Sequence, residues 1–137
     1  MKQKNLKKVL TARNVQFYAK KESEDMDTKD MTLREVCQTL EVSRRAIQGY
    51  EKAGLVSATS KNKYGHLLYN KTARDRVAKI KLYQRFGFTI KEIQGIVDAP
   101  ELVVQQVLRE KIGHMEYERR QMDELIQKAQ ELLQGYQ

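Results

Sequence analysis

The chain has 137 residues, and its 26 Lys and Arg outnumber its 18 Asp and Glu to give a formal net charge of +8. This length suits one compact domain with an added arm or helix, and it excludes a large two-domain enzyme. The single cysteine, Cys37, cannot form an internal disulfide or a multi-thiolate metal site. No apolar run approaches the roughly 18 residues that cross a membrane, and the N-terminus lacks the apolar core of a signal peptide. We therefore expect a cytoplasmic protein with no membrane contact, no metal ion and no cofactor.

The charge is unevenly distributed along the chain. Residues 1–30 carry a net charge of +3, residues 31–90 carry +8, and residues 91–137 carry −3. A basic centre of this kind is typical of proteins that bind a polyanion. A solvated basic surface is the alternative explanation.

Residues 1–30 form a basic arm followed by an acidic, polar linker over residues 22–30. Three roles stay open for this segment, because they rest on composition alone: contact with DNA, packing on a dimer, or disorder.

Two short helices are predicted next. Thr32 and Glu35 form a capping box that begins a helix ending near Leu40. Ser43 is a good N-cap for a second helix, and Gly54 is suited to end it in a left-handed conformation. Two short helices joined by about three residues are the helix-turn-helix pattern.

The second helix carries the side chains that read DNA in such a motif. Arg44, Arg45 and Gln48 offer hydrogen bonds to base edges and phosphates, because residues near the start of a recognition helix face the major groove. Tyr50 and Lys52 are suited to hold the DNA backbone. The alternative is an ordinary helical hairpin with a polar face.

A small hairpin is predicted from two apolar runs, residues 55–59 and 66–69. The polar link between them, residues 60–65, contains Lys61 and Lys63, which suits a wing that contacts phosphates. A solvated loop is the alternative.

Two further helices follow. Asn70 caps the first, over residues 71–86, and a second capping box at Thr89 and Glu92 begins the next, which extends to about Val97.

A long helix is predicted over residues 101–134. Its apolar residues recur at alternating spacings of four and three residues, which is the pattern of a heptad seam. A helix of this length is about 50 Å long, so the rest of so small a chain cannot bury the seam. We therefore expect a homodimer. The seam comprises Leu108, Ile112, Met115, Arg119, Met122, Ile126, Ala129 and Leu133. Its one polar member, Arg119, either fixes the register or lies near an exposed end of the overlap.

This order of elements resembles the MerR family of bacterial transcription regulators. Residues 42–56 look like the family stretch Val-Ser-x-x-Thr-Leu-Arg-x-Tyr-Glu-x-x-Gly-Leu-Leu, residues 65–69 like Gly-Tyr-Arg-x-Tyr, and residues 85–93 like Leu-Gly-Phe-Ser-Leu-Glu-Glu-Ile. The resemblance implies a mainly α fold: a winged helix-turn-helix domain over residues 31–98, then an antiparallel coiled-coil dimerisation helix over residues 99–137. It also implies a homodimer that bends and untwists a two-fold promoter operator, so that RNA polymerase can engage the promoter.

The resemblance also implies DNA contacts. The full predicted set of DNA-contacting residues is Arg44, Arg45, Gln48, Tyr50, Lys52, Lys61, Lys63, Tyr64, His66 and Tyr69. The chain departs from the family pattern at three positions: Gln48 replaces an Arg, Gly49 a frequent Tyr, and Leu67 the Arg of the wing. These departures concern the operator sequence and not the fold.

An effector is not identified by the sequence. Metal-sensing members place cysteines near the end of the long helix, drug-sensing members carry a further domain, and neither fits this length and composition. We expect an effector bound at the dimer interface, or none. The alternative function is a dimeric helix-turn-helix interaction module that binds a protein partner, with weak or non-specific DNA binding. An enzyme is disfavoured because His66 and His114 lie in no catalytic arrangement.

Overall fold

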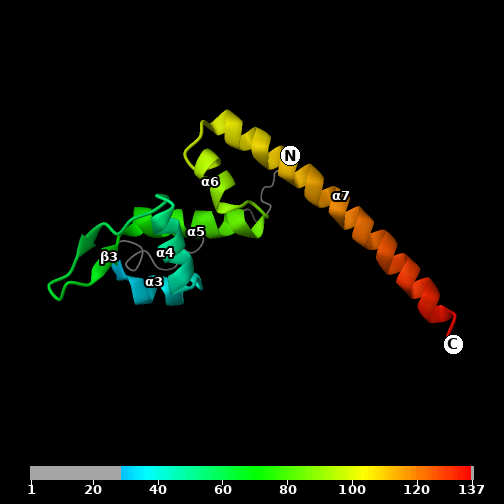
Figure 1. The fold of residues 1–137 in the computed structure, drawn as a ribbon, viewed down its shortest axis with the longest axis horizontal. Coiled ribbons are helices and arrows are strands. Elements are labelled where there is room, and N and C mark those ends of the chain that lie inside the picture. Colours follow the sequence, from blue (N-terminus) through cyan, green and yellow to red (C-terminus); the bar gives the residue numbers. More distant parts are fainter. Residues whose placement is uncertain (1–28, 137) are drawn as a thin grey trace, which may run out of the picture. The chain divides into compact units, whose positions relative to one another are not determined.

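The computed structural model describes residues 29–136, and the predicted N-terminal arm lies almost wholly outside them. Within the described residues, 29–81 and 82–136 form two compact units. The elements are β1 (Met31–Thr32), α3 (Leu33–Leu40), α4 (Arg44–Lys52), β2 (Ser60–Lys61), β3 (Leu67–Tyr69), α5 (Lys71–Arg85), α6 (Ile90–Ile96) and α7 (Glu101–Gln134). This is a mainly helical fold with a small sheet (Figure 1). None of the described helices is long and apolar enough to cross a membrane.

The helix-turn-helix begins and ends where the sequence predicts. The Thr32 hydroxyl accepts a hydrogen bond from the Glu35 backbone N–H at 3.2 Å, and the Glu35 carboxylate accepts one from the Thr32 N–H at 2.9 Å. Ser43 caps α4 by accepting from the Ala46 N–H at 2.9 Å. Gly54 follows α4 with a φ of 77°, a left-handed conformation that costs glycine little. Each of these caps satisfies a backbone donor or acceptor that the helix leaves open.

The predicted hairpin is only partly correct. The sheet has the order β1-β3-β2, with Met31 opposite Tyr69 and Ser60 opposite Leu68 in antiparallel pairs. Residues 55–58 of the first predicted strand lie outside the sheet, since Leu55 and Val56 are consecutive and both buried, whereas a half-buried strand buries alternate residues. Only Thr59 reaches the sheet, where its N–H donates to the Leu68 carbonyl at 2.8 Å. The sequence does not predict strand β1, because a strand of two residues is too short to show an alternation of buried and exposed side chains. Hereafter "the wing" means the β2–β3 hairpin, residues 60–69, which extends beyond α3 and α4 in Figure 1.

The first unit is built around a compact apolar core. Its most deeply buried side chains are Val36 of α3, Ile47 of α4, Tyr69 of β3, and Val77 and Ile80 of α5. Each helix and the central strand therefore contribute to one core, which fixes α4 and the wing on the same scaffold.

The second unit contains the last turn of α5, then α6 and α7. The capping box predicted at Thr89 and Glu92 is present, with hydrogen bonds of 2.9 and 3.1 Å. Tyr83 and Phe88 meet edge to face at a centroid separation of 6.0 Å. Helix α7 spans the residues predicted for it and is continuous in Figure 1.

Candidate nucleic-acid interface

Helix α4 is divided into a buried face and a charged face. Ile47 is fully buried and anchors the helix in the core, whereas Arg44, Arg45 and Gln48 are exposed. Lys52, at the end of α4, is also exposed. The packing of Ile47 therefore presents the three predicted base-reading side chains together to the solvent.

Two of the predicted DNA-contacting residues, Tyr50 and Tyr69, lie in the core. Tyr50 is 2% exposed, and Tyr69 has no exposed surface. The Tyr69 hydroxyl donates a hydrogen bond to Glu51 Oε2 at 2.6 Å, which connects the wing to α4. Burial, together with the hydrogen bond and negative charge of Glu51, raises the pKa of the Tyr69 hydroxyl above its ordinary value of 10.0. Both side chains therefore help to position α4 and the wing by packing, and contact of either residue with DNA stays a prediction.

The wing carries the other predicted contacts on an ordered turn. Lys61, Lys63, Tyr64 and His66 are all exposed. The Asn62 side-chain oxygen accepts hydrogen bonds from the Tyr64 N–H at 2.9 Å and from the His66 N–H at 3.0 Å. The Lys63 ammonium lies 5.2 Å from the centre of the Tyr64 ring. Asn62 thus fixes the turn that carries Lys61, Lys63 and the aromatic ring of Tyr64.

The basic surplus of residues 31–90 divides into structural and free cations. Arg74 donates to the Lys29 carbonyl at 2.8 Å, Arg76 donates to the Leu55 carbonyl, and Lys81 donates to the Leu40 carbonyl at 2.9 Å. These three side chains bind the protein's own backbone. Which cations bind the backbone in this way cannot be predicted from the sequence alone, because each carbonyl lies on a distant segment of the chain.

Several cations without a salt bridge belong to α3, α4 and the wing. Within residues 29–136, no salt bridge involves any of the following side chains: Arg34, Arg44, Arg45, Lys52 and Lys61. Unneutralised cations on one surface raise the local potential and favour an anionic partner.

Helix α7 has no buried side chain among its 34 residues. The predicted seam residues Ile112, Met115, Met122, Ile126 and Leu133 are 37% to 62% exposed. Leu108 is half-buried, and Arg119 and Ala129 are exposed. Leu125 and Leu132, which the sequence analysis did not include, are as exposed as the seam and widen the apolar face.

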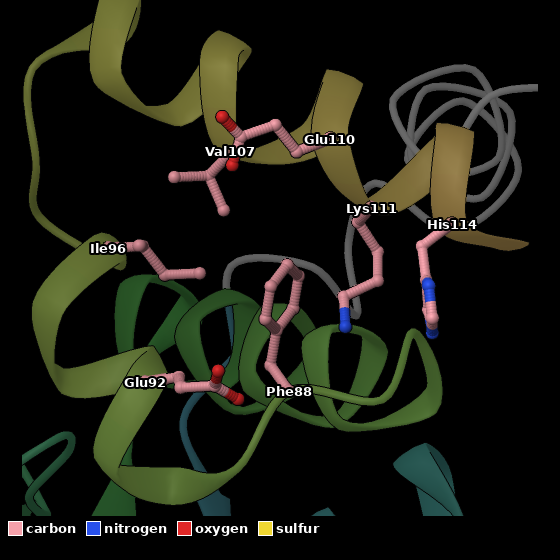
Figure 2. Close-up of a pocket in the computed structure, with 7 residues that line it drawn as sticks. All are labelled: Phe88, Glu92, Ile96, Val107, Glu110, Lys111 and His114. Carbon is pink, nitrogen blue, oxygen red and sulfur yellow. The ribbon is translucent and has the colours of Figure 1, made fainter.

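A pocket of about 400 Å³ lies between α6 and α7 in the second unit. Phe88, Ile96 and Val107 form its apolar part, and Lys111 extends toward the Phe88 ring (Figure 2), with its ammonium 4.6 Å from the ring centre. His114 also lines it, and Lys111 and His114 are neighbours in sequence of the seam residues Ile112 and Met115. This pocket thus lies close to the predicted dimer seam. The dimer interface is the place where the sequence predicts an effector, unless the protein has none.

The fold and the exposed basic surface define a winged helix-turn-helix protein. Residues 31–100 match the family described as MerR HTH family regulatory protein, and residues 74–132 match the family described as MerR, DNA binding. The chain belongs to the MerR family.

Two curated relatives are similar to less than half of this chain. The mercuric resistance operon regulatory protein of Bacillus cereus is 35% identical over 63 residues, which are 44% of this chain and 48% of that protein. The nodulation protein NolA of Bradyrhizobium diazoefficiens is 30% identical over 64 residues, 47% of this chain and 27% of that protein. The matched region is thus less than half of each of these relatives.

Solved structures share the fold. The N-terminus of MtaN, the Bacillus subtilis multidrug transporter activator, superimposes with a TM-score of 0.60 at 23% identity, covering 75% of this chain and 97% of that one. HiNmlR, a MerR family regulator lacking the sensor domain and bound to promoter DNA, superimposes with a TM-score of 0.62 at 14% identity, covering 80% and 91%.

Proposed function

We propose that this protein is a sequence-specific DNA-binding transcriptional regulator. One observation carries the proposal. Arg44, Arg45 and Gln48 lie together on the exposed face of α4, and Ile47 fixes the other face of this helix in the core. Arginine pairs bidentately with guanine, and glutamine pairs with adenine, in the major groove. Lys61 and Lys63 on the wing supply contacts to phosphates, which set the register without reading sequence.

We infer that the regulator is a homodimer held by antiparallel α7 helices. When Leu108 is placed opposite Leu133 of the partner subunit, the heptad spacing brings Ile112 opposite the partner's Ala129 and Met115 opposite the partner's Ile126. All of these side chains carry exposed apolar surface in the single chain, or are half-buried. Burial of that surface is the driving force for association.

The same register gives Arg119 a role near the two-fold axis. Glu116 and Asp123 lie three and four residues from Arg119 on the same side of the seam, and all three are exposed. In the antiparallel arrangement, each Arg119 lies among acidic groups from both helices. A parallel or shifted pairing would remove this charge match, so Arg119 specifies the register.

The dimer presents two copies of α4 to a two-fold promoter operator. We infer that it bends and untwists this DNA to help RNA polymerase engage the promoter. Bending a site of 20–30 base pairs costs on the order of 1–6 kcal/mol, which must be offset by protein–DNA contacts. The family to which the chain belongs supports this mode of action.

Selection of duplexes from a randomised pool by the full chain tests the proposal. We expect the pool to converge on an inverted repeat, because two identical readers are related by a two-fold axis. Binding to that repeat should exceed binding to a shuffled duplex by at least about 4 kcal/mol, with a steep dependence on salt. A pool that does not converge would contradict a sequence-specific regulator.

One observation favours the alternative, a dimeric module that binds a protein and binds DNA weakly or without specificity. Leu67 occupies the wing position where the family pattern has Arg, and it is 41% exposed. An exposed apolar side chain at this position favours a protein surface over a DNA phosphate. Failure of the pool to converge, together with retained dimerisation, would support this alternative.

A further inference from the structure

A hollow of about 590 Å³ lies in the first unit between α3 and the two elements that the proposed function brings to DNA, α4 and the wing. Residues 32–34 at the start of α3, Arg44 in the first turn of α4, and residues 65–67 of the wing line it. The side chains of Arg34, Arg44 and His66 are all exposed around it. Arg34 was not among the residues that the sequence analysis assigned to DNA.

Resting on the proposed function, we propose that this hollow holds a backbone phosphate of the DNA, and that Arg34 is its principal cation. Arg44 and His66 complete the site from the other two walls. Arg34 thereby supplies, from α3, the positive charge that position 67 of the wing lacks, where Leu67 stands in place of the family's Arg.

The charges around the hollow favour an anion. Neither Arg34 nor Arg44 forms a salt bridge within residues 29–136. Glu35, which neighbours Arg34 in sequence, has its carboxylate bonded to the Thr32 N–H at 2.9 Å in the capping box. That bond lowers the pKa of the Glu35 carboxyl from its ordinary value of 4.5, and the carboxylate is held at the helix cap. The positive groups that the hollow offers to an anion are therefore the side chains of Arg34 and Arg44.

The geometry places a DNA strand at this hollow. A recognition helix enters the major groove, and a wing contacts the neighbouring stretch of the duplex. The sugar-phosphate backbone that separates these two contacts must pass between α4 and the wing, and the hollow lies there. A planar guanidinium binds phosphate through two parallel hydrogen bonds. Leu67, 41% exposed, would then face the deoxyribose.

The test compares Arg34→Ala with Arg120→Ala, which removes the same charge from an exposed position on α7 outside the seam. Binding of the full chain to the selected repeat and to shuffled duplex is measured by fluorescence anisotropy across a salt series. For Arg34→Ala we expect affinity to fall roughly tenfold on both duplexes. The slope of log affinity against log salt should fall by about one, with the preference for the repeat kept. Arg120→Ala should match the wild type.

Adding Leu67→Arg to Arg34→Ala tests the compensation directly. A cation on the wing wall of the same hollow should restore the lost affinity and salt slope, and circular dichroism should show that all variants are folded. Wild-type affinity and slope in Arg34→Ala would overturn the phosphate site while leaving the regulator intact. Failure of Leu67→Arg to rescue would overturn the compensation. Absence of specific binding by the wild type would overturn the proposed function itself.

Discussion

The Tyr69 hydroxyl donates a hydrogen bond to Glu51 Oε2 at 2.6 Å, so a residue of the wing is bonded to a residue of the recognition helix. Tyr69 is fully buried and Glu51 is half-buried. This bond fixes the direction of the wing relative to α4. Any DNA contact that needs both elements therefore depends on it.

Replacing Tyr69 by Phe should destabilise the fold. The variant keeps the ring but leaves the Glu51 carboxylate without its partner, and a hydrogen bond to a charged group contributes about 1.5–3 kcal/mol. Urea unfolding should report this loss. Tyr64→Phe, at a position that is 72% exposed, is the matched control and should be close to wild type. Equal stability of the two variants would show that the bond contributes nothing.

The fold should lose stability above pH 10. Burial raises the pKa of Tyr50 and of Tyr83, and burial with Glu51 raises that of Tyr69, all from an ordinary value of 10.0. A raised folded-state pKa means that the stabilisation is complete below pH 10 and is lost as the pH rises beyond it. In this range the free energy of unfolding falls by about 1.4 kcal/mol per pH unit for each tyrosine that is ionised in the unfolded state and still protonated in the folded state. Tyr69→Phe should reduce this slope in urea titrations between neutral and alkaline pH, and an unchanged slope would contradict the assignment.

Replacing Thr89 by Ala should weaken the start of α6. Removal of an N-cap hydroxyl costs about 1 kcal/mol, which thermal unfolding should reveal, and Thr89→Ser should retain most of the cap. Hydrogen bonds from Thr89 lower the pKa of Glu92 from 4.5. The contribution of that carboxylate is therefore present above pH 4.5 and is lost as the pH falls. Thr89→Ala with wild-type stability at neutral pH would argue against the cap.

The seam of α7 predicts which substitutions abolish the dimer. Met122→Asp and Ile126→Asp place charges in the interface and should give monomers in sedimentation velocity. Tyr117→Asp is the matched control, because Tyr117 is 53% exposed but lies on the face of α7 opposite the seam. Surviving dimers of the first two variants, or monomers of the third, would contradict the antiparallel seam.

Local signals in the sequence predicted more of the fold than of the site. Thr32, Ser43 and Thr89 cap helices as expected, because a capping hydroxyl and its partner lie within three residues of each other. The pairing of β1 with β3 could not be predicted, because the two strands lie more than thirty residues apart in the sequence and β1 contributes only two residues to the pairing.

The site was predicted in part, for a related reason. Arg44 and Arg45 are recognisable because their position at the start of a helix is local. The burial of Tyr50 and Tyr69 depends on how distant elements pack. The hollow beside Arg34 depends on the return of the wing toward α3, and nothing in the neighbourhood of Arg34 in the sequence indicates it.

The most direct test of the regulator is the double variant Arg44→Ala, Arg45→Ala, measured on the selected repeat and on a shuffled duplex at one salt concentration. Both side chains are exposed, so the variant should fold and dimerise normally. Each good bidentate pair contributes about 1–3 kcal/mol of discrimination. We predict that the preference for the repeat over the shuffled duplex falls to near unity, while weak binding to both remains. A double variant that keeps the wild-type preference would show that α4 does not read the DNA.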